Sequence, residues 1–345
     1  MKTFKWAVRA AVVTATFIFS IANISAFADT LPGSGKTVRY VQADSLGANY
    51  VADQIVARAM KSLGYDIKLS TMNITLFFAA VAQGDVDLST DVNLPQREPE
   101  FRTVEKQAEI IGTGFITGGG VNGYMIDRKT ALAHNITSIE QMKDPNIASL
   151  FGEDGKAELI SCDPGWSCAD VVNYQLKKFG LAQNVHVVSG KYEALMMDAV
   201  SRIKSGSPAF FYAWSPSWVT SGLVPGKDVV WLPVPADALP PKMPNTGSAL
   251  VKGVVGCAGG ADPCHMAMAS WNAGSVANRA FISANPGIKA LIQQIKFSPA
   301  VWADWESAIS KEPSSNGLFG RLADQWLAAN GSQFTQWVAT ARAAH

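Results

Sequence analysis

Short β-type runs alternate with amphipathic helices from residue 37 onward, and this alternation limits the chain to a few folds. Residues 37–42 (TVRYVQ) have the pattern of a strand, and residues 49–63 have the pattern of an amphipathic helix that Gly64 ends. Strand, helix and strand patterns follow at residues 65–69, 75–82 and 86–90. Strands that alternate with helices are typical of βα units. The sequence therefore predicts an α/β fold.

A glycine-rich stretch predicts a crossing between two lobes. Residues 112–120 are rich in glycine and lead into a strand pattern at residues 121–126. With 345 residues, the chain is long enough for two lobes of ordinary size. We place one lobe at residues 29–124 and 256–345, and the other lobe at residues 125–255.

Several later elements carry their own boundary signals. Ser138 with Gln141 has the pattern of a capping box. Ser298 followed by Pro299 marks the start of another helix. From residue 272 onward the pattern predicts helices, at residues 277–284, 288–295, 299–309 and 318–329.

The N-terminus has the pattern of a secretory signal peptide at residues 1–28. An apolar run at residues 10–24 follows three basic residues, and Ala26-Phe27-Ala28 matches the small-x-small cleavage pattern, so we expect the mature chain to start at Asp29. An uncleaved membrane anchor is the alternative. No later apolar run approaches ~18 residues, so we expect a periplasmic protein without stable membrane insertion after cleavage. The basic residues are Lys2, Lys5 and Arg9.

The four cysteines fall into two short pairs. In an oxidising compartment, an even number of closely spaced cysteines predicts local disulfides, here Cys162–Cys168 and Cys257–Cys264. A zinc site is the rival interpretation, but the two-residue knuckle spacing is missing. Redox chemistry would need a CxxC motif, and the chain has none.

The loop between the first two cysteines, SCDPGWSCAD, combines two kinds of recognition. We expect Trp166 at its exposed apex and an amphipathic helix directly after it, at residues 170–179. A helix N-terminus favours an anion, and an aromatic face attracts a soft cation. The loop therefore predicts a ligand that is positive at one end and negative at the other.

Charge and motifs exclude several other functions. A formal net charge of +1 gives no basic footprint for a nucleic acid. The sequence contains no GxSxG, HExxH or GxxxxGK[ST] motif, and its four histidines are scattered. We expect no catalytic residues, no metal site and no cofactor. An exported enzyme on an α/β scaffold stays the alternative from another functional class.

A second aromatic run, FFYAWSPSW at residues 210–218, places Trp214 where a predicted strand ends. The carboxyl ends of strands are where α/β folds bind ligands. A purely structural role in the core is the competing interpretation.

Three runs of this sequence resemble the ProX-type substrate-binding proteins of glycine betaine/proline ABC importers. They are SCDPGWSCAD, FFYAWSPSWV and PGKDVVWLPVP, and the similarity extends over nearly the whole mature chain, including NGYMIDRKTA and ITSIEQMKDPNIASLF. The resemblance implies a two-lobed periplasmic binding fold with a ligand cleft between the lobes. It also implies an ABC permease and its ATPase subunit as partners, and we expect a monomer.

The resemblance also implies site residues. Members of that family hold a trimethylammonium group in a cage of three tryptophans, and they bind the ligand carboxylate through two backbone amides and a histidine. By this resemblance Trp166 and Trp214 correspond to the second and third cage tryptophans, and Ser167 and Cys168 to the amide donors. The Cys162–Cys168 pair corresponds to the disulfide of this loop in the family.

At the first cage position the chain departs from the family. Aligned without a gap, Asn93 stands where the family has its first tryptophan, and Arg97 stands where it has its histidine. Arginine remains an anion partner, whereas asparagine replaces an aromatic face by an amide. We therefore expect glycine betaine, proline betaine or a related quaternary amine as ligand, with an amino acid such as proline or histidine as the alternative.

Overall fold

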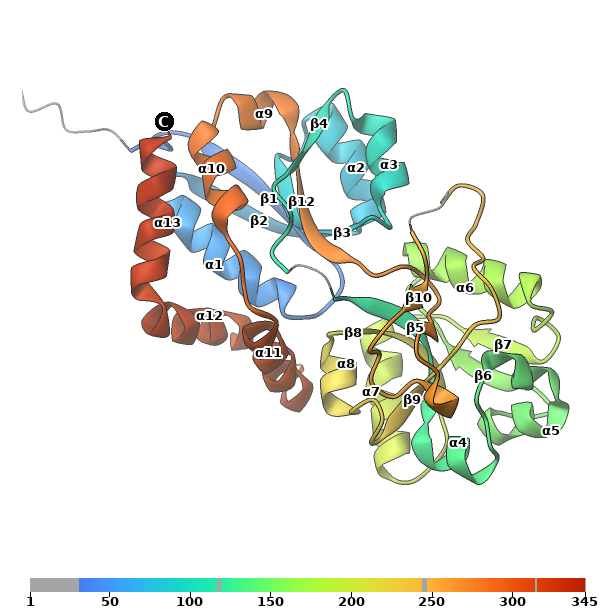
Figure 1. Ribbon diagram of the computed structural model, residues 1–345. Helices are drawn as coiled ribbons and strands as arrows, with labels where there is room; N and C mark the ends of the chain where they lie inside the picture. The colour runs from blue at the N-terminus through green and yellow to red at the C-terminus, as the bar shows by residue number, and fades with distance from the viewer. Residues whose placement is uncertain (1–30, 117–118, 244–246, 314, 345) are drawn as a thin grey trace, which may run out of the picture. The chain divides into compact units, whose positions relative to one another are not determined.

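The computed structural model describes residues 31–116, 119–243, 247–313 and 315–344. The predicted signal peptide and its cleavage site before Asp29 lie outside these residues. The described chain contains two five-stranded sheets and one two-stranded sheet, with helices between the strands (Figure 1). The fold is therefore α/β, as predicted.

The first sheet has the strand order β2-β1-β3-β12-β4. β1 pairs in parallel with β2 and β3, whereas β12 runs antiparallel to β3 and β4. A strand from late in the chain thus lies between two early strands. The strands are β1 Thr37–Ala43, β2 Asp66–Met72, β3 Leu88–Leu94, β4 Ala108–Ile111 and β12 Asn272–Asn278.

The second sheet has the strand order β7-β6-β8-β5-β9. β6 is parallel to β7 and β8, and β5 is antiparallel to β8 and β9. The strands are β5 Val121–Asp127, β6 Ala157–Ile160, β7 Val185–Val188, β8 Phe210–Ser215 and β9 Val229–Leu232, and a separate pair is formed by β10 Leu250–Val251 and β11 Cys264–His265.

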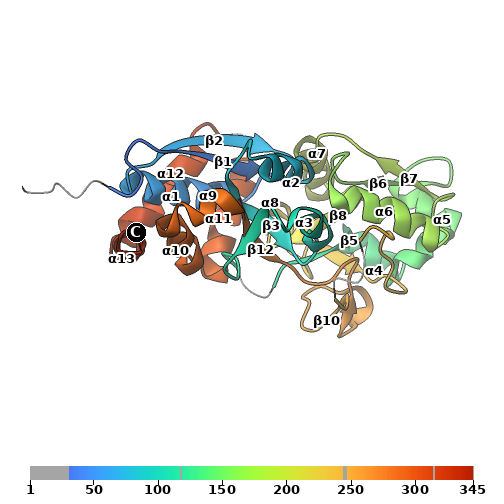
Figure 2. The same ribbon diagram turned by 90° about the horizontal axis from the view of Figure 1, so that it is seen from above.

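Each sheet has its own helices (Figure 2). With the first sheet lie α1 Asn49–Ser62, α2 Ile74–Gln83, α3 Glu98–Val104, α9 Arg279–Ser283, α10 Pro286–Gln294, α11 Pro299–Lys311, α12 Leu318–Ala329 and α13 Gly331–Ala343. With the second sheet lie α4 Arg128–Ala133, α5 Pro145–Ala148, α6 Ser167–Lys178, α7 Tyr192–Lys204 and α8 Trp218–Gly222, and short 3-10 helices cover Ile139–Lys143, Ser149–Phe151 and Ala258–Gly260.

The boundary signals in the sequence act as predicted. The Ser138 side chain and Gln141 form the expected capping box, at the start of a 3-10 helix. The hydroxyl of Ser298 caps α11 by accepting from the Val301 N–H. Gly64 directly follows the C-cap residue of α1 in the left-handed conformation, with φ 92°, which glycine adopts at low cost.

Two elements of the C-terminal part differ from the prediction. Residues 272–278 form β12, where helices alone were expected, and the last helix α13 was not predicted. The NAGSVAN segment of β12 lacks the bulky alternation that marks a strand, and it becomes one because β3 and β4 supply hydrogen-bond partners on both sides.

The chain passes from the first sheet to the second between β4 and β5, and it returns between β11 and β12. Residues 117 and 118 of the predicted crossing lie outside the described part. The lobe boundaries after residues 124 and 255 stay a prediction. Among the helices of the described residues, none is both long and apolar enough to cross a membrane.

Candidate ligand-binding site

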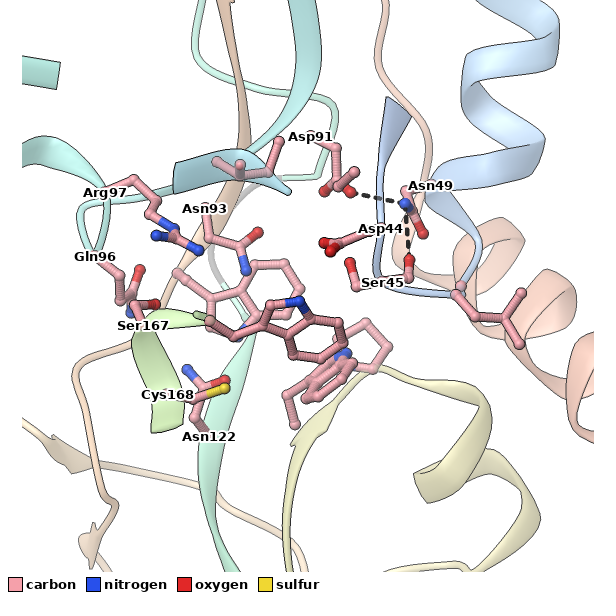
Figure 3. Close-up of a pocket in the computed structure, with 18 of the residues that line it drawn as sticks. Asp44, Ser45, Asn49, Asp91, Asn93, Gln96, Arg97, Asn122, Ser167 and Cys168 are labelled. Atoms are coloured by element: carbon pink, nitrogen blue, oxygen red, sulfur yellow. Dashed lines mark hydrogen bonds between the residues drawn. The ribbon is translucent and has the colours of Figure 1, made fainter. Parts of the chain in front are cut away.

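One pocket of about 100 Å³ is lined by residues of both sheets and their helices (Figure 3). Its lining includes all six residues that the sequence analysis singled out as ligand contacts. They are Asn93, Arg97, Trp166, Ser167, Cys168 and Trp214.

The loop before α6 is held in place at several points. The Cys162–Cys168 disulfide closes it, and the Cys257–Cys264 disulfide is also present, as predicted. The carboxylate of Asp163 accepts from the backbone N–H of Tyr192, at 2.5 Å, and from Lys191 Nζ, at 2.9 Å. The loop is therefore anchored to the start of α7 as well as to its own helix.

Trp166 is buried, with 6% of its surface exposed, so the expectation of an exposed apex is wrong. The indole packs against Tyr192 at a centroid distance of 5.8 Å and against Trp214 at 6.0 Å. Tyr192 also stacks on Trp214 at 4.8 Å. We call these three rings the aromatic corner. Two of its rings, Trp166 and Trp214, line the pocket, and aromatic faces in general attract cations.

The N-terminus of α6 adjoins this corner. Trp166 is the N-cap residue, and Ser167 and Cys168 occupy the first helical positions. In the part of the chain that the structure describes, no side chain caps this end. The first N–H groups of a helix lack intrahelical partners and lie at the positive end of the dipole, so this end of the pocket favours an anion.

Arg97 adds a positive charge on the same side of the pocket. Its Nη1 donates to Thr75 Oγ1, at 2.9 Å, and to Glu100 Oε1, at 3.0 Å. The Thr75 hydroxyl in turn donates to the carbonyl of Gly165, at 3.2 Å, which connects Arg97 to the Trp166 loop. Figure 3 shows Arg97, Gln96 and Ser167 on one side of the pocket.

Three carboxylates line the pocket as well. Figure 3 shows Asp44 and Asp91 with Asn49, on the side away from Arg97. The Asn49 amide donates to Asp91 Oδ2, at 2.7 Å, and to the carbonyl of Ser45. Burial, and secondly the carboxylate of Asp53, raise the pKa of Asp91 to about 8.

The third carboxylate, Glu306, comes from α11. It is 3% exposed, and its Oε1 accepts from the Ala48 N–H at 2.9 Å. Burial raises the pKa of Glu306 to about 7, while the Ala48 N–H and then the nearby indole of Trp302 act in the opposite direction. The pocket thus has the Arg97 guanidinium, paired with Glu100, and the N-terminus of α6 at one side, and carboxylates at the other.

These carboxylates, together with Trp271 and Trp302, are lining residues that the sequence analysis missed. Asp44 and Asp91 lie at or near the ends of β1 and β3, the position where α/β folds bind ligands, and this signal was available. Glu306 lies on the buried stripe of α11, between Trp302 and Ile309. The only sequence signal for its place in the pocket was therefore an acidic residue among apolar residues on one helix face.

The arrangement has the character of a binding site for a small dipolar ligand. Among the described residues, no group of three or more His, Cys, Asp or Glu side chains is placed to hold a metal ion. Aromatic faces, unpaired amides, a guanidinium and carboxylates recognise charge and shape.

Comparison with known proteins agrees with this character. Residues 36–329 match the family described as the substrate-binding domain of ABC-type glycine betaine transport systems. The glycine betaine/proline betaine-binding periplasmic protein of Salmonella typhimurium is 34% identical over 339 residues, which cover 97% of this chain and 99% of that protein. The glycine betaine-binding periplasmic protein OusX of Dickeya dadantii is also 34% identical, and the match covers 92% of this chain and 93% of that protein.

Solved structures show the same two-lobed fold. Lactococcal OpuAC, in its closed-liganded conformation with glycine betaine, has a TM-score of 0.63 at 16% identity and covers 88% of this chain and 99% of its own. A choline-binding protein of an ABC transporter, in complex with choline, has a TM-score of 0.67 at 15% identity and covers 89% of this chain and 96% of its own. The matched family consists of transport binding proteins and not of enzymes, and this chain belongs to it: it is a substrate-binding protein of the ABC-type glycine betaine transport family.

Proposed function

We propose that this protein captures a small zwitterion of the betaine class in the periplasm and delivers it to an ABC permease that an ATPase subunit drives. The candidate ligands are glycine betaine, proline betaine and related quaternary amines, in line with the ligands named for its relatives. The pattern of residues 1–28 supports export by a signal peptide.

The observation that carries this proposal is the placement of the aromatic corner beside the N-terminus of α6. Trp166 belongs to both, because its ring packs on Trp214 while its backbone caps the helix. A ligand cation against these rings would place its carboxylate within reach of the Ser167 and Cys168 amides and of Arg97. These roles are part of the proposal.

An amino acid such as proline or histidine is the second candidate. Asn93 favours it, because this side chain lines the pocket with an amide that can accept a hydrogen bond from a ligand N–H. A tryptophan at that position would offer a cation only its aromatic face.

Calorimetric titration of the purified protein with glycine betaine, proline betaine, choline, proline and histidine tests the proposal. We expect the carboxylated ligands to bind and choline to bind more weakly, since choline lacks the group that Arg97 and the α6 amides would hold. Equal affinity for choline would contradict the carboxylate side of the site. Turnover of any of these compounds would contradict a pure binding function.

A further inference from the structure

We infer that the carboxylates Asp91 and Glu306, with Asp44 beside them, form a subsite that accepts N–H donors from the cationic end of the ligand. Zwitterions whose ammonium group keeps at least one N–H should therefore bind more tightly than their fully methylated counterparts. This inference rests on the proposed capture of a small zwitterion and, among its candidates, favours ligands that bear an N–H over the quaternary amines.

The state of the Glu306 carboxylate is the first argument. The side chain is 97% buried, lines the pocket and bonds through Oε1 to the Ala48 N–H. Its Oε2 atom is buried and makes no hydrogen bond of normal geometry among the described residues, although the Trp302 indole and the Trp218 N–H lie near enough to the carboxylate to lower its pKa. A buried carboxylate oxygen without a donor is costly, and a ligand N–H would remove that cost.

The surroundings of Asp91 are the second argument. Its Oδ2 accepts from Asn49, and the charged groups that shift its pKa are all negative: Asp53, Glu306 and Asp44 each raise it. Asp53 does not line the pocket, and its Oδ1 accepts hydrogen bonds from the hydroxyls of Tyr40 and Thr90. Carboxylates that face one pocket repel one another, which favours their protonated forms, and a cation between them would favour the ionised forms.

The chemistry of the cation decides between ligand types. A quaternary ammonium presents only methyl groups, which an aromatic face satisfies and a carboxylate oxygen cannot use as a conventional donor. A protonated amine brings both the charge and one or more N–H groups. The pocket offers the indoles of Trp166, Trp214, Trp271 and Trp302 together with three carboxylates and the Asn93 amide, so an N–H-bearing ammonium would find both aromatic faces and hydrogen-bond acceptors there.

The graded N-methyl series of glycine tests the inference on the unmodified protein. Glycine, N-methylglycine, N,N-dimethylglycine and glycine betaine share one carboxylate and differ in N–H number, and proline with proline betaine form a second pair. We expect N,N-dimethylglycine to bind more tightly than glycine betaine by a factor of about 10 or more, because one hydrogen bond to a charged group contributes that much to affinity. Proline should exceed proline betaine in the same way.

Two variants assign the preference to these side chains. Glu306→Gln keeps an acceptor for the Ala48 N–H but removes the charge of the side chain. Asp91→Asn, in β3, keeps an acceptor for the Asn49 amide and also removes the charge. Each should reduce the preference for N,N-dimethylglycine to about 3-fold or less. Asp304→Asn is the matched control, because it removes one exposed charge from the same helix outside the pocket.

The outcomes separate this inference from the proposed function. If glycine betaine binds as tightly as N,N-dimethylglycine, the subsite is overturned and zwitterion capture stands. If the preference exists but survives in both variants, its assignment to Asp91 and Glu306 is overturned. If no member of either series binds, the proposed function itself fails.

Discussion

The indole rings of Trp166 and Trp214 meet edge to face, with centroids 6.0 Å apart and an interplanar angle of 63°. One ring comes from the disulfide-closed loop before α6, and the other comes from the end of β8. Tyr192, which comes from α7, stacks on Trp214, so each ring of the aromatic corner packs against another ring of the corner. The orientation of the rings that line the pocket therefore depends on packing between three separate segments.

Replacing Trp166 by leucine should weaken the binding of betaine-class ligands about 10-fold or more, because one aromatic face is lost. Calorimetric titration of glycine betaine and N,N-dimethylglycine measures the effect. Trp337→Leu is the control, since Trp337 is equally buried, at 5% exposure, but lies in α13 outside the pocket. Loss of affinity in both variants to the same degree would mean that folding, and not ligand contact, explains the result.

Replacing Arg97 by methionine should lower the affinity for glycine betaine by about 10- to 100-fold, because a charge-assisted hydrogen bond to the ligand carboxylate is lost. Choline has no carboxylate, so the ratio of choline affinity to glycine betaine affinity should rise. Arg102→Met is the matched control, an exposed change in helix α3, which begins directly after Arg97. An unchanged ratio would remove Arg97 from the carboxylate side of the site.

Replacing Cys162 and Cys168 by serine should weaken ligand binding as well as lower stability. The bridge closes the loop that positions the Trp166 ring and the first amides of α6. Loss of a short-loop disulfide costs on the order of 2 kcal/mol of unfolding free energy. The same change at Cys257 and Cys264, outside the pocket, should lower stability and leave affinity unchanged, as titration and chemical denaturation together can show.

The ligand-free protein should lose stability as pH rises from about 5 to about 8. Burial raises the pKa of Glu306 to about 7 and that of Asp91 to about 8, so the folded state binds more protons than the unfolded state in this range. For Glu306 alone, the free energy of unfolding should fall by on the order of 3 kcal/mol.

Chemical denaturation at a series of pH values measures this dependence, and Glu306→Gln should make it shallower. A free energy of unfolding that stays constant or increases over this pH range would show that these carboxylates are not destabilised by burial.

Much of the fold was predictable because its signals are local. The helical period of α1, the Ser298 cap of α11 and the short cysteine spacings each depend on neighbouring residues. The strand β12 was not predictable in this way, since its small residues become a strand only between β3 and β4. The same limit applies to Trp166, whose burial depends on Tyr192 and Trp214.

For the site, the sequence by itself determined the two-ended recognition: an aromatic ring at a helix start, and an arginine in place of a histidine by resemblance. Only the tertiary structure decided that Asp91 and Glu306 join this pocket and that Glu306 Oε2 is buried with no hydrogen bond of normal geometry from the described residues. The reason is physical. Periodicity and capping act over a few residues, whereas the desolvation of a charge depends on every group packed around it, and these groups come from distant parts of the chain.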